Sequence, residues 1–118
     1  MGFLDRYFKQ KKVNYISPSM YHKMLEDHVP HILMDVRTQQ EFDHEHIPNA
    51  VLFPVSIVEA KIKDFFPDKE MTYVLYCRSG IRSQSALLIM KQLGYDQVYD
   101  MGGIIDWPYE TIKKSESI

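Results

Sequence analysis

The chain has a single cysteine, Cys77, and it lies among residues that could assist its chemistry. The segment reads Cys77-Arg78-Ser79-Gly80-Ile81-Arg82-Ser83. A thiolate is a good nucleophile, and neighbouring arginines or a helix N-terminus favour it over the thiol near neutral pH. A buried structural cysteine is the alternative, but Arg, Ser and Gly neighbours do not suit an apolar core. We therefore identify Cys77 as the candidate catalytic nucleophile.

The flanking sequence predicts a strand before this segment and a helix after it. Residues 73–76 read Tyr-Val-Leu-Tyr, a run typical of a buried strand, and apolar residues recur at helical spacing from Ser83 to Leu93. Cys77 would then lie at the turn, where loop N–H groups and the helix dipole form a cradle for an anion. Ligand crevices of open α/β sheets lie at the carboxyl ends of strands, in agreement with this position.

Strand and helix patterns alternate along the rest of the chain. Further strands are predicted at residues 32–36, 50–53 and 97–99, and further helices at 20–27, 57–65 and 104–113. Pro18 suits the first turn of the first helix, and Gly94 suits the end of the helix that follows Cys77. The alternation predicts an α/β domain with a mostly parallel central sheet of about five strands and helices on both faces.

Composition narrows the class of protein. With 118 residues, 45% hydrophobic and 25% charged, the chain has the length and composition of one globular domain. A formal net charge of −2 with dispersed Lys and Arg argues against nucleic-acid binding. The sequence shows no apolar stretch long enough to span a bilayer and no signal-peptide pattern, so we expect a cytoplasmic protein. One cysteine cannot form an intramolecular disulfide, which suits a reducing compartment.

Four segments of the chain resemble the rhodanese family of sulfurtransferases in order and spacing. They are the Cys77–Ser83 segment, Asp35-Val36-Arg37 with Glu41-Phe42, His46-Ile47-Pro48-Asn49-Ala50, and Gly102-Gly103-Ile104-Ile105-Asp106-Trp107. The resemblance covers roughly Ile16 to Trp107. Glu45 and Asn49 stand where the family usually has glycine; Asn tolerates the left-handed conformation, and Glu45 leaves the fold assignment intact.

The resemblance implies a rhodanese-like domain over residues 16–118, after an N-terminal extension over residues 1–15. It implies that Cys77 carries a transferable sulfane sulfur as a persulfide, in an active-site loop whose residues 78–83 bind the substrate. The expected partners are a small anionic sulfur donor such as thiosulfate and a cyanide, thiol or protein sulfur acceptor. No metal or organic cofactor is implied.

Two other functions stay open. Dual-specificity phosphatases, which resemble this scaffold, have five residues between the Cys and Arg of their loop, whereas four residues separate Cys77 from Arg82. The shorter loop makes a smaller cradle, which favours sulfur over a phosphate clamped by arginine. A noncatalytic or sulfur-carrier module that docks on a partner is the second alternative, and the presence of Cys77 weakens it.

Residues outside the loop have weaker functional claims. Asp35 ends a predicted strand and could orient the loop, and Arg37 is four residues from Glu41, at the spacing of a structural ion pair on a helix. The histidines lack metal-binding spacing, so we expect no metal site, and His46 is expected to be structural. Met1 to Lys12 is basic and amphipathic; membrane contact is conceivable, but packing on its own domain is favoured.

Overall fold

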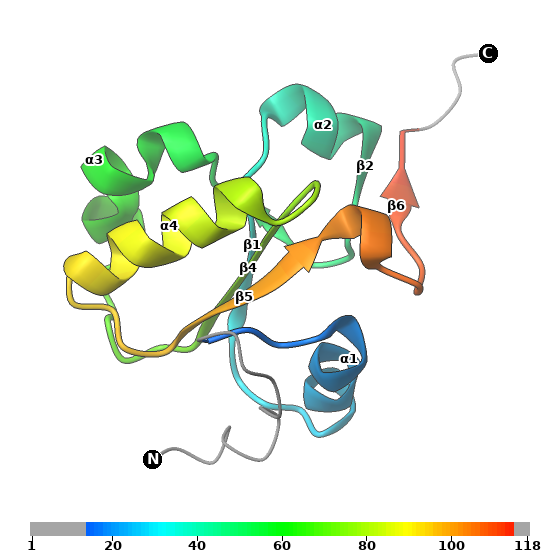
Figure 1. The fold of residues 1–118 in the computed structure, drawn as a ribbon, viewed down its shortest axis with the longest axis horizontal. Helices are drawn as coiled ribbons and strands as arrows, with labels where there is room; N and C mark the ends of the chain where they lie inside the picture. The colour runs from blue at the N-terminus through cyan, green and yellow to red at the C-terminus, as the bar shows by residue number, and fades with distance from the viewer. Residues whose placement is uncertain (1–13, 115–118) are drawn as a thin grey trace.

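A four-stranded parallel sheet forms the centre of the computed structural model, which describes residues 14–114 (Figure 1). The strands lie in the order β3-β1-β4-β5 and are β1 (Ile32–Asp35), β3 (Val51–Leu52), β4 (Tyr73–Cys77) and β5 (Val98–Gly103). Each neighbouring pair is parallel. The predicted α/β class and parallel sheet are therefore confirmed, with four strands in place of about five.

Helices cover both faces of this sheet (Figure 1). They are α1 (Pro18–Glu26) on one face, α3 (Val55–Phe65) and α4 (Ile81–Gln92) on the other, and the short α2 (Gln39–His44). Side chains of β4 alternate between the faces, as the two-residue period of a strand requires. Val74 and Tyr76 pack in the core beneath α1, whereas Tyr73, Leu75 and Cys77 pack in the core beneath α3 and α4.

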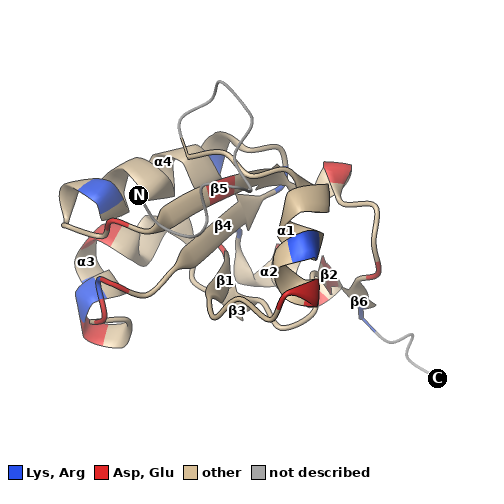
Figure 2. Ribbon diagram, turned by 90° about the horizontal axis from the view of Figure 1, so that it is seen from below, with Lys and Arg blue, Asp and Glu red and all other residues tan. Residues whose placement is uncertain are grey.

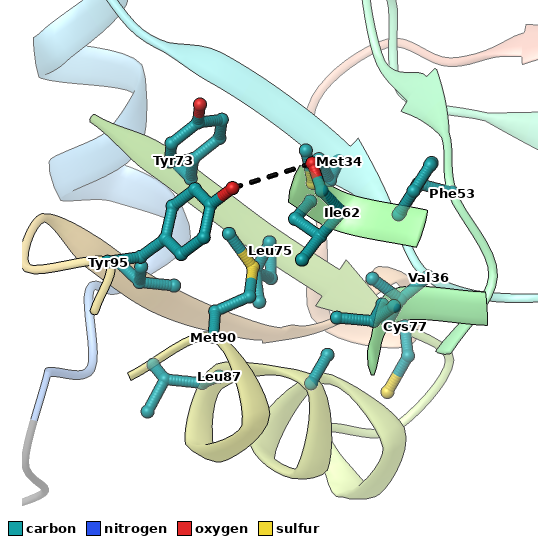
Figure 3. Close-up of a cluster of buried hydrophobic side chains, with 13 residues drawn as sticks. Met34, Val36, Phe53, Ile62, Tyr73, Leu75, Cys77, Leu87, Met90 and Tyr95 are labelled. Atoms are coloured by element: carbon teal, nitrogen blue, oxygen red, sulfur yellow. Dashed lines mark hydrogen bonds between the residues drawn. The ribbon is translucent and has the colours of Figure 1, made fainter. Parts of the chain in front are cut away.

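The core beneath α3 and α4 includes a buried hydrogen bond that ties two elements together. Figure 3 shows Met34, Ile62, Leu75 and Met90 in this cluster, with the Tyr95 ring beside them. The Tyr95 hydroxyl donates to the carbonyl oxygens of Phe66 at 2.6 Å and Ile62 at 3.4 Å. It therefore satisfies the carbonyl of Phe66 at the C-terminus of α3, whereas the Ile62 carbonyl already accepts the Phe66 N–H at 2.8 Å.

Local sequence explains where the helices begin and end. Ser17 caps α1 by accepting the N–H of Met20 at 3.2 Å, and Pro18 follows as its first residue. Gly94, with φ +98°, follows the end of α4 in the left-handed conformation. Both termini were predicted from the sequence. Asn49 also adopts a positive φ, 70°, where the family usually has glycine.

The predicted helix over residues 104–113 is wrong. The chain forms only a single 3₁₀ turn, η2 (Ile104–Asp106), and then an extended segment ending in β6 (Ile112–Lys113). Pro108 explains the difference, because proline disfavours the helical conformation at the preceding residue and lacks an N–H. Trp107 is accordingly extended, with ψ 113°. β6 pairs antiparallel with β2 (Glu45–His46), a small sheet that the sequence did not reveal.

The chain before β1 also contributes to the sheet. Tyr15 forms a parallel bridge with Asp100 at the outer edge of β5, and the Ile16 N–H donates to the Asp100 carbonyl at 3.0 Å. The amphipathic segment predicted over residues 1–12 lies outside the described residues. Among residues 14–114, no helix is long and apolar enough to cross a membrane.

Charged residues of both signs are interspersed over the described surface. Figure 2 shows basic and acidic residues together on α1 and on α3 rather than gathered by sign. On α3, for example, Lys61 and Lys63 lie between Glu59 and Asp64 in the sequence.

Candidate active site

Cys77 is the last residue of β4 and lies at the turn between that strand and α4, as predicted. The residue is 1% exposed. Figure 3 shows its sulfur pointing away from the apolar side chains of the core. Two polar groups contact the sulfur: the Gly80 N–H donates to it at 3.0 Å, and the Ser83 hydroxyl lies 3.5 Å away.

Gly80 gives the loop its shape. It adopts φ +108°, in the left-handed region, and serves as the N-cap of α4. This conformation turns the chain so that a backbone N–H meets the sulfur three residues earlier. The N-terminal end of a twelve-residue helix, with its partial positive charge, therefore begins beside the sulfur. The Gly80 N–H and this end of the helix can both stabilise negative charge that develops on the sulfur in a reaction.

The end of β5 supports the loop from behind. A Cβ on Gly103 would lie 2.1 Å from the Arg78 carbonyl oxygen, so only glycine permits the observed approach of the two backbones. The Ile105 N–H donates to the same carbonyl at 3.3 Å. Gly103 thus makes room for the loop, and the 3₁₀ turn η2 follows it in place of the predicted helix over residues 104–113.

Arg82 is held by a helix on the other side of the loop. Its guanidinium donates two hydrogen bonds, of 2.7 and 2.9 Å, to the Glu41 carboxylate on α2. These hydrogen bonds lower the pKa of Glu41 to about 2. Glu41 also completes a capping box with Thr38, which fixes its position at the start of α2. Arg82 is therefore neutralised by a partner 41 residues away in sequence.

The predicted Arg37–Glu41 ion pair is wrong. Arg37 precedes Thr38, the N-cap of α2, so the two side chains do not share a helix. Arg37 instead pairs with Asp35 within the buried core, at 2.7 Å from Nη2 to Oδ2 and 2.9 Å from Nε to Oδ1. The same guanidinium donates to the Glu45 carbonyl at 2.6 Å. The carboxylate that pairs with Arg37 is therefore that of Asp35, and Glu41 pairs with Arg82.

Asp35 is fully buried and lies next to the strand that carries the cysteine. Its Oδ2 accepts the Tyr76 hydroxyl at 2.8 Å, and the same hydroxyl accepts the Ile47 N–H at 3.1 Å. Burial, with the nearby Asp35 charge, raises the pKa of Tyr76 well above its usual value. Asp35 and Arg37 therefore fix Tyr76, the residue before Cys77, and their hydrogen bonds go to this network rather than to the loop.

A cleft of about 580 Å³ lies between the loop, η2 and α2. Arg78 and Ile105 line one side, and Glu41 and His44 line the other. Arg78 is exposed, in contrast to Arg82, and so presents its charge to a molecule entering the cleft. Cys77 is not among the residues that line this cleft; Arg78, the next residue of the loop, is.

The acidic residue that contacts Ser83 was not predicted from the sequence. Asp100, on β5, accepts the Ser83 hydroxyl at 2.7 Å and the Gly102 N–H at 2.8 Å. It lies 17 residues from Ser83 in sequence, and its only sequence signal is its position just before the two glycines. His46 stacks on Phe42 and bonds its carbonyl at 2.9 Å, a structural position consistent with the prediction.

Comparison with known proteins connects this site to one family. The model of the Rhodanese-like domain family matches residues 17–109. A sulfurtransferase of Allochromatium vinosum is 34% identical over 96 residues, which span 80% of this chain and 88% of that protein. The thiosulfate sulfurtransferase PspE of Escherichia coli is 32% identical over 80 residues, 68% of this chain and 77% of that protein.

A solved structure is similar in both fold and sequence. A rhodanese from Escherichia coli, solved with anions, superposes with a TM-score of 0.65 at 31% sequence identity. The superposition covers 70% of this chain and 98% of the other. The match therefore extends over nearly the whole of that protein.

The close approach of Gly103 to the loop predicts that two neighbouring substitutions lower the stability of the fold by different amounts. Gly103→Ala places its methyl group against the Arg78 carbonyl and should destabilise the fold by about 3 kcal/mol or more. Gly102→Ala has room, with its nearest contact 3.6 Å away, but must keep φ +89°, at a cost of about 1–2 kcal/mol. Urea unfolding at neutral pH measures both. Equal stability of the Gly103→Ala variant and the parent would contradict the described packing.

The Glu41–Arg82 pair predicts a pH-dependent stability difference between the parent and Glu41→Gln. A carboxyl whose pKa is lowered by folding stabilises the folded state above its unfolded pKa of ~4.3. That contribution is lost as the pH falls through the folded value of about 2. The difference in unfolding free energy should therefore stay constant from about pH 7 to 5 and shrink between about pH 4.5 and 2.

Urea unfolding of both proteins across this pH range checks the prediction. Arg82→Gln serves as the matched variant, because it removes the other partner and should abolish most of the pH-dependent difference. A difference that stays constant down to about pH 2 would show that Arg82 does not set the titration of Glu41.

Proposed function

The chain belongs to the rhodanese-like domain family of sulfurtransferases, and from this premise we propose that it transfers a sulfane sulfur from a small anionic donor through a persulfide on Cys77. One observation carries the proposal: the single cysteine lies at a strand-to-helix turn with its sulfur accepting a loop N–H at 3.0 Å. Thiosulfate is the donor that we propose, in line with the name of the relative from Escherichia coli.

The first step forms the persulfide. The Cys77 thiolate attacks the outer sulfur of thiosulfate, a new S–S bond forms, and the bond to the sulfite group breaks with its electron pair. Sulfite leaves, and the outer sulfur stays on Cys77 as a negatively charged persulfide. Backbone N–H groups held in a fixed orientation, such as that of Gly80, stabilise this charge without reorganising.

The second step returns the enzyme to its starting state. The thiolate of an acceptor, or cyanide, attacks the terminal sulfur of the persulfide and takes it, and the Cys77 thiolate is released as the leaving group. The bonds to sulfur that form and break in these two steps are those of the cysteine, the donor and the acceptor. The chemistry requires a reduced cysteine, so we propose a reducing compartment such as the cytoplasm as its location.

Residues 78–83 have different proposed roles in this cycle. Arg78 attracts the anionic donor, because it is exposed and lines the 580 Å³ cleft. Ser79 and Gly80 shape the turn, Ile81 begins α4, Ser83 contacts the sulfur, and Arg82 fixes the loop through Glu41. Asp35 and Arg37 support the loop indirectly by holding Tyr76 beside Cys77.

Cys77→Ser should abolish sulfur transfer from thiosulfate to cyanide while the fold persists, because a hydroxyl does not ionise near neutral pH. The parent should gain one sulfur, about 32 mass units, on incubation with thiosulfate, and a reductant should remove it. Intact-mass measurement and thiocyanate formation check both statements. A Cys77→Ser variant that keeps most of the activity would refute the persulfide mechanism, whereas an inactive parent would point to the noncatalytic alternative.

Arg78→Ala should raise the KM for thiosulfate several-fold and lower kcat less, because the charge attracts the donor before the transition state. The effect should shrink at high ionic strength, where exposed charges are screened. Lys61→Ala is the matched control, since it removes an exposed cation from α3, away from the cleft. Steady-state kinetics at low and high salt measure the two variants. Equal KM values for Arg78→Ala and Lys61→Ala at low salt would contradict the assignment.

A further inference from the structure

Behind the cysteine, a chain of polar groups leads away from the sulfur into the core. The Cys77 sulfur lies 3.5 Å from the Ser83 hydroxyl oxygen, and that oxygen lies 2.7 Å from Oδ1 of Asp100. Ser83 is 0% exposed and Asp100 is 6% exposed. A carboxylate is costly to bury without hydrogen bonds, and here one of those bonds leads, through a single hydroxyl group, to the reacting sulfur.

The direction of the hydrogen bonds follows from the number of hydrogens. The Ser83 hydroxyl has one hydrogen, and the oxygens within its reach are those of Asp100 at 2.7 Å, the Gly80 carbonyl at 3.2 Å and the Gly102 carbonyl at 3.5 Å. A carboxylate at the shortest distance is the strongest acceptor of the three. The hydroxyl therefore donates to Asp100, and its lone pairs are left to accept the S–H of Cys77.

We propose that Ser83 and Asp100 form a proton relay that ionises Cys77 for the sulfur-transfer function proposed above, on which this inference rests. The S–H bond of Cys77 breaks as its proton moves to Ser83 Oγ, and the Ser83 hydroxyl proton moves to the Asp100 carboxylate. The products are a thiolate, an intact hydroxyl and a neutral carboxylic acid. One proton and one negative charge exchange places, and no other reactant is needed.

The relay also avoids an unfavourable arrangement of charge. If the thiol lost its proton directly to water, a thiolate and the Asp100 carboxylate would both be charged in the core, separated by one hydroxyl group. Like charges at short range disfavour ionisation. Moving the negative charge from Asp100 to the sulfur leaves the net charge of the site unchanged. The negative charge then lies beside the N–H of Gly80 and the N-terminal end of α4. Arg82 on α4 is the cation whose charge interacts with Cys77.

Asp100 can exchange its proton with water on a different side of the loop from Arg78. It lines a second cleft of about 430 Å³, together with the titratable side chains of Tyr15 and Asp106. This cleft shares no lining residue with the cleft that contains Arg78. Sulfur substrates and protons would thus approach the nucleophile by separate routes.

The experiment measures the thiolate without any sulfur donor, so its outcome is independent of sulfur-transfer activity. Iodoacetamide, a neutral reagent that reacts with thiolates, is added to the full chain between about pH 5.5 and 7, and intact mass follows its addition to Cys77. A shared proton should make the parent rate vary less than about threefold over this range. In Asp100→Asn and Ser83→Ala, the rate should fall about tenfold for each unit decrease in pH.

Two control variants separate the relay from general effects of charge and of hydroxyl loss. Asp106→Asn removes an exposed charge from the second cleft, and Ser85→Ala removes an exposed hydroxyl from α4; both should keep the parent profile. Asp100→Asn retains an oxygen that can accept from Ser83, so circular dichroism should show the parent fold.

The parent measurement alone can overturn the proposal, whatever the variants do. A parent rate that changes about tenfold per pH unit would show an ordinary isolated thiol, and the relay would be refuted. Failure of the folded parent to react below pH 7, although it reacts above about pH 8, would refute it equally, because the sulfur would then be accessible but not ionised. An Asp100→Asn profile that matches the parent would show that Asp100 only holds the loop in place.

Discussion

The site depends on the close packing of two backbone segments, the loop after β4 and the end of β5. Gly103 leaves no space for a side chain beside the Arg78 carbonyl, whereas a Cβ on Gly80 would meet Gly102 at an ordinary contact distance of 3.5 Å. This contact sets the height of the loop above the sheet and so the position of the Gly80 N–H relative to the sulfur. The chemistry proposed for Cys77 therefore rests on a packing constraint in which neither partner is a catalytic side chain.

Much of this arrangement could be predicted because its signals are local. The strand before Cys77, the helix after it and the glycine that ends that helix each leave a pattern within about a dozen residues. The segment after Gly103 could not be predicted in this way. It carried apolar residues at helical spacing, yet Pro108 prevents a helix there, and the small β2–β6 sheet forms between segments far apart in sequence.

The electrostatic partners could not be predicted, because they are chosen by tertiary contacts. Arg37 and Glu41 have the spacing of an ion pair, but the helix begins between them, and each finds a partner on another element. Asp100 had no recognisable pattern, although the structure places it one hydroxyl group from the Cys77 sulfur. The sequence shows which residues are charged, but the order of the strands and helices in the fold decides which of them form ion pairs and hydrogen bonds.

The short extended segment before α1 has a consequence for how the domain may be delimited. Asn14 to Ile16 lie along the outer edge of β5, where backbone bonds of 2.8 and 3.0 Å join them to Asp100, and the Asn14 side chain reaches the Val98 carbonyl at 2.9 Å. The family match begins only at residue 17. A chain cut at that boundary would leave the β5 edge uncovered, and an uncovered parallel edge is a template for pairing with a second molecule. These residues thus occupy backbone hydrogen-bonding groups along the edge of β5.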